Sequence, residues 1–279
     1  MTAATLVTPA QQEFDPYAGR SAASPIRFLY ALNPLGKLLA PLPAMALLVF
    51  VRDAATPAAF IVLSYAIILV GASMTKRLTA VLVAVPLAII VIGVGFSIWT
   101  DAAQVDHTAP ALQIGGWTLY WGALAIGFTT GLRIAAIVSL TLIVGLSTTG
   151  PDLVRSMVQQ LRVPYRIGYT ALAAFRFVPR FGYELEVIRQ AHRVRGAHGG
   201  RGPVAAIARW SGYIVPLLAG AIRHAERVAL AMDARAFGAY PDRTERYLVP
   251  WHTRDTVFVV LFVAASALIF WFTYPWTLA

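Results

Sequence analysis

Apolar residues gather into long runs along this chain. A helix needs about 20 residues to cross the hydrocarbon core of a bilayer, and the last three runs reach that length. The first run is weak because Pro41 and Pro43 interrupt it. No pattern typical of a β-hairpin stands out, so we predict an all-α polytopic membrane protein with about five transmembrane helices. The runs are Leu35–Val51, Ala55–Ala72, Thr79–Trp99, Trp117–Leu146 and Thr256–Trp276.

The segment between the last two runs, residues 147–255, carries a helical pattern of its own. Thr149-Gly150-Pro151-Asp152 is typical of a helix start. Pro179 is expected to bend or restart the chain, and Glu186 and Arg189, one turn apart, suit a local ion pair. The helices predicted here are Leu153–Leu161, which Pro164 ends, Tyr183–Arg195, and Val204–Arg235 followed by Gly238 and Pro241.

Composition agrees with a membrane protein. Hydrophobic residues make up 58% of the 279 residues and charged residues only 13%, whereas soluble domains are about one quarter charged. The net charge of +10 first suggests nucleic-acid binding. The positions of the basic residues exclude that reading.

With a cytosolic N-terminus, 21 of the 23 basic residues fall on one side: three in the tail (Lys37 included), two after the second run and sixteen from Arg155 to Arg254. This asymmetry is the positive-inside pattern of membrane proteins. We therefore predict a multi-pass protein of the cell membrane with no nucleic-acid partner. Its predicted parts are a cytosolic tail (1–34, of which 1–24 are expected to be flexible), four spans (35–146), a cytosolic domain (147–255) and a last span (256–279).

Two helix ends in the predicted cytosolic domain resemble each other. Each has a small or apolar residue, an arginine and a small residue: Val194-Arg195-Gly196 and Ala234-Arg235-Ala236. The arginines lie forty positions apart. The simplest explanation is that basic side chains favour helix C-termini and unpaired carbonyls. The alternative is that both arginines bind a partner.

The residues around these motifs resemble the transmembrane T component of energy-coupling factor transporters, the group of cobalt- and vitamin-uptake permeases. The resemblance covers most of the chain and is most specific over residues 146–238. The residues that carry it are Leu146–Leu153, Leu161-Arg162-Val163-Pro164, Phe175-Arg176-Phe177-Val178-Pro179, Glu184–Ile188, Arg223-His224-Ala225-Glu226-Arg227 and the two arginine motifs.

The resemblance implies a coupling subunit without chemistry of its own. T components join two ATP-binding cassette (ABC) ATPases to a small membrane subunit that binds the substrate. Two coupling helices each end in an Ala-Arg-Gly-like motif that docks on one ATPase. Arg195 and Arg235 would be the docking arginines, flanked by Val194, Gly196, Ala234 and Ala236. Ala236 departs from glycine, so the second helix is expected to stop at Gly238 instead.

Other kinds of site find little support. There is no cysteine, no Walker-type loop and no zinc-ligand spacing, so we expect no catalytic residue, metal or cofactor. Asp53, Asp101, Asp106 and His107 make a metal site only conceivable. Arg133, inside a span, is expected to have a structural role, either reaching to the membrane surface or pairing with a carbonyl inside the bundle. The alternative function is the permease of an ordinary ABC importer, although the Glu-Ala-Ala-type motif usual in that class is missing. The sequence does not indicate which vitamin or metal is transported.

Overall fold

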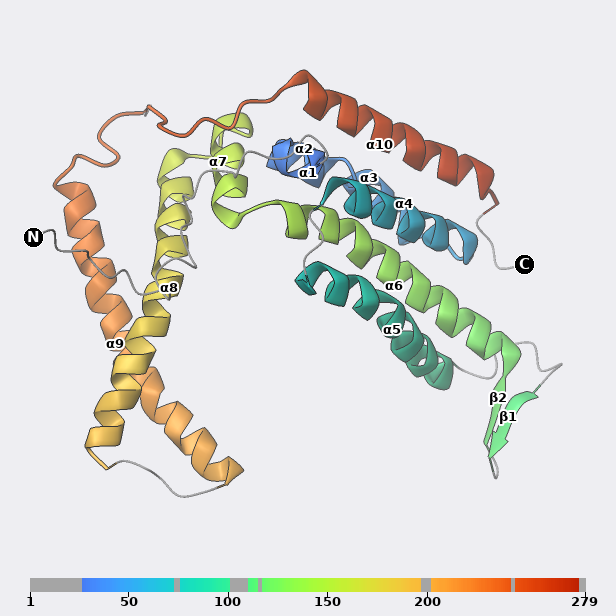
Figure 1. Ribbon diagram of the computed structural model, residues 1–279, viewed down its shortest axis with the longest axis horizontal. Coiled ribbons are helices and arrows are strands. Elements are labelled where there is room, and N and C mark those ends of the chain that lie inside the picture. Colours follow the sequence, from blue (N-terminus) through green and yellow to red (C-terminus); the bar gives the residue numbers. More distant parts are fainter. Residues whose placement is uncertain are drawn as a thin grey trace, which may run out of the picture. The chain divides into compact units, whose positions relative to one another are not determined.

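The computed structural model describes residues 27–72, 76–100, 110–114, 117–196, 202–241 and 244–275 (Figure 1). These residues form two compact units. We call residues 27–156 together with 249–275 the membrane unit, and residues 157–248 the arm unit. The tail predicted for residues 1–24 lies outside the described residues.

The membrane unit contains the predicted spans. By length and composition, segments of α5, α6 and α10 can each cross a membrane. The weak first run is divided into α2 and α3, as Pro41 and Pro43 suggested, and α4 is a shorter apolar helix. The all-α polytopic fold is thereby confirmed. The helices are α1 (Phe28–Ala31), α2 (Pro34–Leu39), α3 (Leu42–Leu48), α4 (Ala55–Gly71), α5 (Lys76–Trp99), α6 (Trp121–Ser147) and α10 (Thr253–Phe272), with α7 (Gly150–Gln160) crossing into the arm unit.

A short β-hairpin precedes α6, and the sequence analysis did not predict it. Strand β1 (Pro110–Ile114) pairs antiparallel with β2 (Trp117–Tyr120). The helix predicted from Trp117 therefore begins at Trp121. The signal was present in the sequence, because Gly115-Gly116 between two short apolar stretches is a typical hairpin connection.

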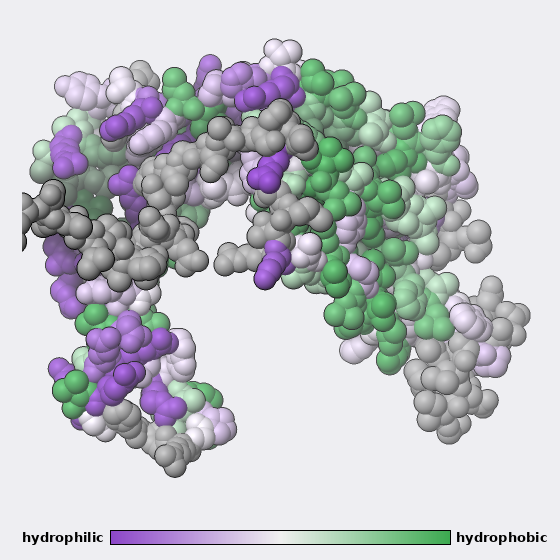
Figure 2. Space-filling model, viewed as in Figure 1, coloured by the Kyte–Doolittle hydropathy of each residue, from purple (hydrophilic) through white to green (hydrophobic). Residues whose placement is uncertain are grey.

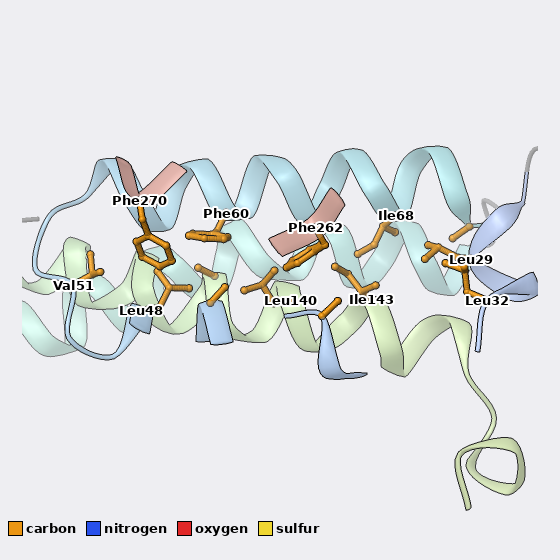
Figure 3. Close-up of a cluster of buried hydrophobic side chains, with 14 of the residues drawn as sticks. Leu29, Leu32, Leu48, Val51, Phe60, Ile68, Leu140, Ile143, Phe262 and Phe270 are labelled. Atoms are coloured by element: carbon orange, nitrogen blue, oxygen red, sulfur yellow. The ribbon is translucent and has the colours of Figure 1, made fainter. Parts of the chain in front are cut away.

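The core of the membrane unit is built from side chains of several helices, among them α4, α6 and α10. Phe60 of α4 and Phe270 of α10 have ring centroids 5.1 Å apart, and Leu140 of α6 is fully buried beside them (Figure 3). Burial of these side chains holds segments from both ends of the sequence together.

The outer surface of the membrane unit is apolar. The face seen in Figure 2 is mostly hydrophobic over these helices, and on α5 Val83, Leu87 and Val91 are each more than 60% exposed. A water-soluble domain rarely exposes such continuous apolar surface. The unit is therefore that of a multi-pass membrane protein.

Close packing of α5 against α6 depends on glycine. A Cβ atom added at Gly127 would lie 2.1 Å from Ser97 Oγ and 2.4 Å from the Gly93 carbonyl oxygen. One added at Gly131 would lie 3.0 Å from the Ile89 carbonyl oxygen, whereas one at Gly95 would meet nothing within 4 Å. Small residues that let two backbones approach are typical of membrane helix pairs. Gly93 and Gly127 thus serve packing, and Gly95 does not.

Two basic side chains are bound to backbone carbonyls within the membrane unit. Lys37 is 1% exposed, and its Nζ donates to the carbonyls of Leu29 (3.1 Å) and Ser147 (2.9 Å). A cation is favourable at the C-terminus of α6, where carbonyls are left unpaired. Lys37 is therefore not the solvated tail charge that we predicted. Arg133 donates to the carbonyls of Val49 and Val51, each at 3.2 Å, as expected for a structural arginine.

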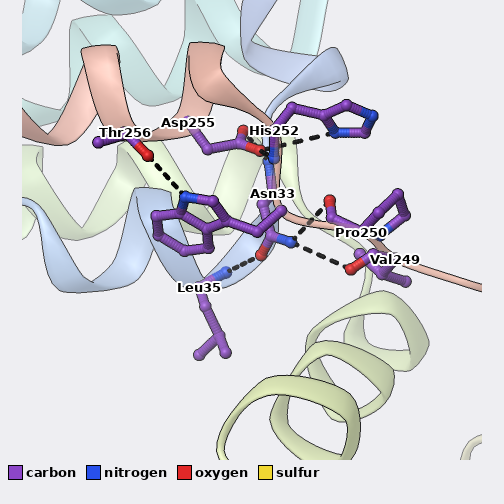
Figure 4. Close-up of polar contacts among 8 residues, drawn as sticks. Asn33, Leu35, Val249, Pro250, His252, Asp255 and Thr256 are labelled. Atoms are coloured by element: carbon purple, nitrogen blue, oxygen red, sulfur yellow. Dashed lines mark hydrogen bonds and ion pairs between the residues drawn. The ribbon is translucent and has the colours of Figure 1, made fainter.

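A polar clasp joins the start of α2 to the start of α10 (Figure 4). Asp255, 1% exposed, accepts from the backbone N–H groups of Asn33 and His252, each at 2.7 Å. The Asn33 amide donates to the carbonyls of Val249 and Pro250, each at 3.3 Å. The two carboxylate oxygens thus satisfy one buried N–H from each end of the chain.

The clasp predicts a stability effect for Asp255→Asn. An amide offers one acceptor, so one of the two backbone N–H groups loses its partner, which costs about 2 kcal/mol when buried. Thermal unfolding in detergent should show this loss for Asp255→Asn. The exposed Glu226→Gln serves as control. An unchanged midpoint for Asp255→Asn would mean that the clasp contributes little.

The arm unit consists mainly of two long helices. They are α8 (Tyr165–Val194) and α9 (Pro203–Asp233). The prediction that Pro179 bends or restarts a helix before Tyr183 is wrong in its boundaries, because α8 runs through Pro179 without a break. A proline removes one helical hydrogen bond. Close to Pro179, the Phe177 ring contacts the His224 ring of α9 at 4.4 Å between centroids and the Phe181 ring of α8 at 6.2 Å.

Candidate functional site

The two arginine motifs lie at opposite ends of one helix pair. Ring contacts run from Tyr165–Phe237 (5.7 Å) at one end to His192–Tyr213 (5.2 Å) at the other, so α8 and α9 are antiparallel. Figure 1 shows the two helices crossing. At 1.5 Å rise per residue, helices of this length separate their ends by roughly 40 Å. The arm unit thus presents Arg195 and Arg235 far apart.

At the first tip, Arg195 closes α8 and Gly196 turns the chain. The N–H of Arg195 donates to the Ala191 carbonyl at 3.1 Å, and the N–H of Gly196 donates to the Arg193 carbonyl at 3.1 Å. Gly196 has φ +69°, the left-handed conformation that commonly ends helices and that glycine adopts without penalty. The glycine of the motif therefore has a backbone role.

At the second tip, Ala236 takes the same left-handed position. It has φ +54°, its N–H donates to the Asp233 carbonyl at 2.9 Å, and the Phe237 N–H donates to the Met232 carbonyl at 3.0 Å. These two bonds define a Schellman motif, with Arg235 at the helix cap. The expectation that Gly238 ends the helix is wrong: the turn is made at Ala236, and Gly238, φ +88°, follows it.

Both arginines are accessible. Arg195 and Arg235 are exposed, and neither guanidinium makes a hydrogen bond or ion pair within the described residues. Val194 beside the first is 89% exposed. A guanidinium offers five donors in a rigid fork that suits carboxylates and carbonyls. Two such groups without side-chain partners among the described residues are suited to binding another molecule.

Nearby arginines are engaged within the helix pair instead. Arg189 forms the predicted ion pair with Glu186, at 3.8 Å, and its guanidinium lies 5.2 Å from the Trp210 ring centroid. Arg180 pairs with Glu184 at 3.0 Å. Arg195 and Arg235 differ from these two arginines in having no such partner among the described residues.

The residues that contact the second tip were not predicted from the sequence. Tyr165, Arg166 and Tyr169, at the start of α8, contact the chain just beyond Arg235. These residues are about seventy positions away from that tip in sequence. Only the antiparallel pairing of the helices could have indicated them.

The described residues give no support to the conceivable metal site. Among them, no three His, Asp or Glu side chains are grouped so as to hold a metal ion. Asp101, Asp106 and His107 lie outside the part of the chain that the structure describes.

One helix of the arm unit is also long and apolar enough to cross a membrane. The residues of α9 are poorly buried, and Val204, Ile207 and Val215 are each at least 70% exposed. Composition alone thus does not assign α9 to the cytosol.

Comparison with known proteins identifies relatives. The profile of the family described as "Cobalt transport protein" (CbiQ) matches residues 26–246. The energy-coupling factor transporter transmembrane protein EcfT of Bacillus subtilis (strain 168) is 29% identical over 175 residues, 60% of this chain and 66% of that protein. The EcfT protein of Exiguobacterium sibiricum is 30% identical over 169 residues, 58% and 64% of the respective chains. The matched part of the chain thus spans just under two thirds of these relatives.

Proposed function

Because the chain belongs to the cobalt transport protein (CbiQ) family, we propose that it is the transmembrane coupling subunit of an energy-coupling factor uptake transporter. In this role it carries no catalytic site. It links two ABC-type ATPases to a small membrane subunit that binds a vitamin or a transition-metal ion. The relatives' names as EcfT proteins support the transporter class.

The observation that carries the proposal is the shared geometry of the two tips. Arg195 and Arg235 each close a long helix, each precedes a left-handed small residue, and each is exposed at an opposite end of the pair. Two equivalent, distant tips suit two equivalent partners. Each ATPase would receive one tip in a surface groove, where the guanidinium meets carboxylates or carbonyls.

The membrane unit supports the remaining parts of the proposal. Its apolar outer surface provides the bilayer anchor. The excess of arginine from Arg155 to Arg254 favours a cytosolic arm unit and N-terminus in the cell membrane, where the ATPases would find their nucleotide. Movement of the ATPases would then be transmitted along α8 and α9 to the membrane.

Purification of the tagged protein from its native membrane in mild detergent tests the proposal. Mass spectrometry of the co-purifying proteins should identify ABC-type ATPases and a small polytopic membrane protein. ATPases together with a periplasmic or lipoprotein receptor would instead indicate an ordinary ABC importer. A folded preparation without any ATPase would contradict the coupling role.

A further inference from the structure

The first turn of α8 packs against the chain that follows Arg235. The Phe237 ring lies edge-on to the rings of Tyr165 and Tyr169, with centroids 5.7 and 6.3 Å away. Edge-to-face pairs of this kind stabilise beyond the area that they bury. Phe237 is the residue whose N–H closes the Schellman motif of the second tip, so these contacts act directly on the turn.

Polar contacts hold the next residues. Arg166 Nη2 donates to the Gly238 carbonyl, and the Tyr165 hydroxyl donates to the Tyr240 carbonyl at 2.6 Å. A Cβ atom at Gly238 would lie 3.1 Å from Arg166 Nε, so the side chain lies directly against this backbone. Together with the ring contacts, these bonds hold the chain at Phe237, Gly238 and Tyr240.

The second tip needs such support more than the first. The left-handed conformation is unfavourable for every residue with a Cβ atom, whereas glycine adopts it freely. The first tip has Gly196 at this position, and the second has Ala236. Without outside contacts, Ala236 would favour right-handed conformations, and the backbone that directs Arg235 would change.

We propose that Tyr165, Arg166 and Tyr169 are positioning residues for the Arg235 tip: their contacts hold Ala236 in the left-handed conformation that directs Arg235 outward. The start of one coupling helix thereby sets the geometry of the other helix's tip. Docking of an ATPase at the Arg235 tip rests on the proposed function, whereas the conformation of the tip does not.

Hydrogen exchange of the full chain in nanodiscs tests the positioning role. In the double variant Tyr165→Ala/Arg166→Ala, exchange of the Ala236 and Phe237 amides should rise about tenfold, because their bonds to Asp233 and Met232 open more often. Alanine favours helix, so α8 itself should persist. The Arg195 tip is an internal control and should exchange as before.

Adding Ala236→Gly provides the decisive comparison. Glycine removes the conformational penalty, so the triple variant should recover most of the lost protection. The matched control Arg180→Ala removes an exposed arginine of α8 that pairs only with Glu184 among the described residues, and should leave the tip unchanged. Exchange within twofold of wild type in the double variant, or no recovery in the triple variant, would overturn the proposal.

Binding of the ATPases separates this inference from the proposed function. Reduced binding in the double variant, restored by Ala236→Gly, supports both. Faster exchange at the tip with undiminished ATPase binding supports the positioning role and removes the docking role of Arg235.

Discussion

The double variant Arg195→Glu/Arg235→Glu is expected to lose its ATPases while still inserting into the membrane. Both side chains are exposed and lack partners among the described residues, so the folded chain does not depend on them. In a complex, each would be a buried arginine anchor, and such anchors typically contribute a few kcal/mol. A glutamate at either position would also be repelled by carboxylates in an ATPase groove that binds arginine. Co-purification at physiological salt measures the effect.

The single variants and a charge-matched control sharpen this test. Each single change should weaken binding by roughly 30-fold or more, corresponding to about 2 kcal/mol. Arg180→Glu/Arg227→Glu changes the net charge equally at exposed positions within α8 and α9, away from the two tip motifs, and should retain both ATPases. Retention of both ATPases by the Arg195/Arg235 double variant would refute the docking hypothesis.

The substitution Gly127→Ala is expected to destabilise the membrane unit by about 3 kcal/mol, at the upper end for overpacked positions. The new Cβ atom would lie 2.4 Å from the Gly93 carbonyl oxygen and 2.6 Å from the Ser97 nitrogen. Both are backbone atoms, so no side-chain rotation relieves the clash and α5 must move away from α6. The measurement is the fraction of folded protein after a thermal ramp in detergent.

Gly145→Ala is the matched control on the same helix. A Cβ atom there meets nothing within 4 Å, and alanine favours helix over glycine by about 1 kcal/mol, so this variant should be neutral or slightly stabilised. Equal unfolding midpoints for Gly127→Ala and Gly145→Ala would show that α5 and α6 can move apart without loss of stability.

The sequence predicted features that depend on local pattern. Long apolar runs predicted the spans, Pro41 and Pro43 predicted the broken first helix, and spacing predicted the Glu186–Arg189 pair. Each of these depends on residues a few positions apart. The similarity of the arginine motifs was also readable, because both stand at predicted helix ends.

What the sequence did not reveal depends on contacts between distant segments. Lys37 looked like a tail charge until Ser147, 110 positions away, supplied a carbonyl. Ala236 looked merely small, whereas its left-handed conformation is compatible with alanine only in a supporting environment. The contact of Phe177, two residues before Pro179, with His224 of α9 likewise joins segments far apart in sequence.

The antiparallel pairing of α8 and α9 gives the arm unit an approximate two-fold axis through the crossing. A half-turn about it exchanges the Arg195 tip with the Arg235 tip, since each arginine is followed directly by a small residue in the left-handed conformation. Two identical ATPase subunits related by a two-fold axis would present the same groove twice. Each groove would then receive one tip. The symmetry is not exact, because the first motif has Val194 and Gly196 where the second has Ala234 and Ala236. Two different ATPase subunits would therefore each be able to select one of the two tips.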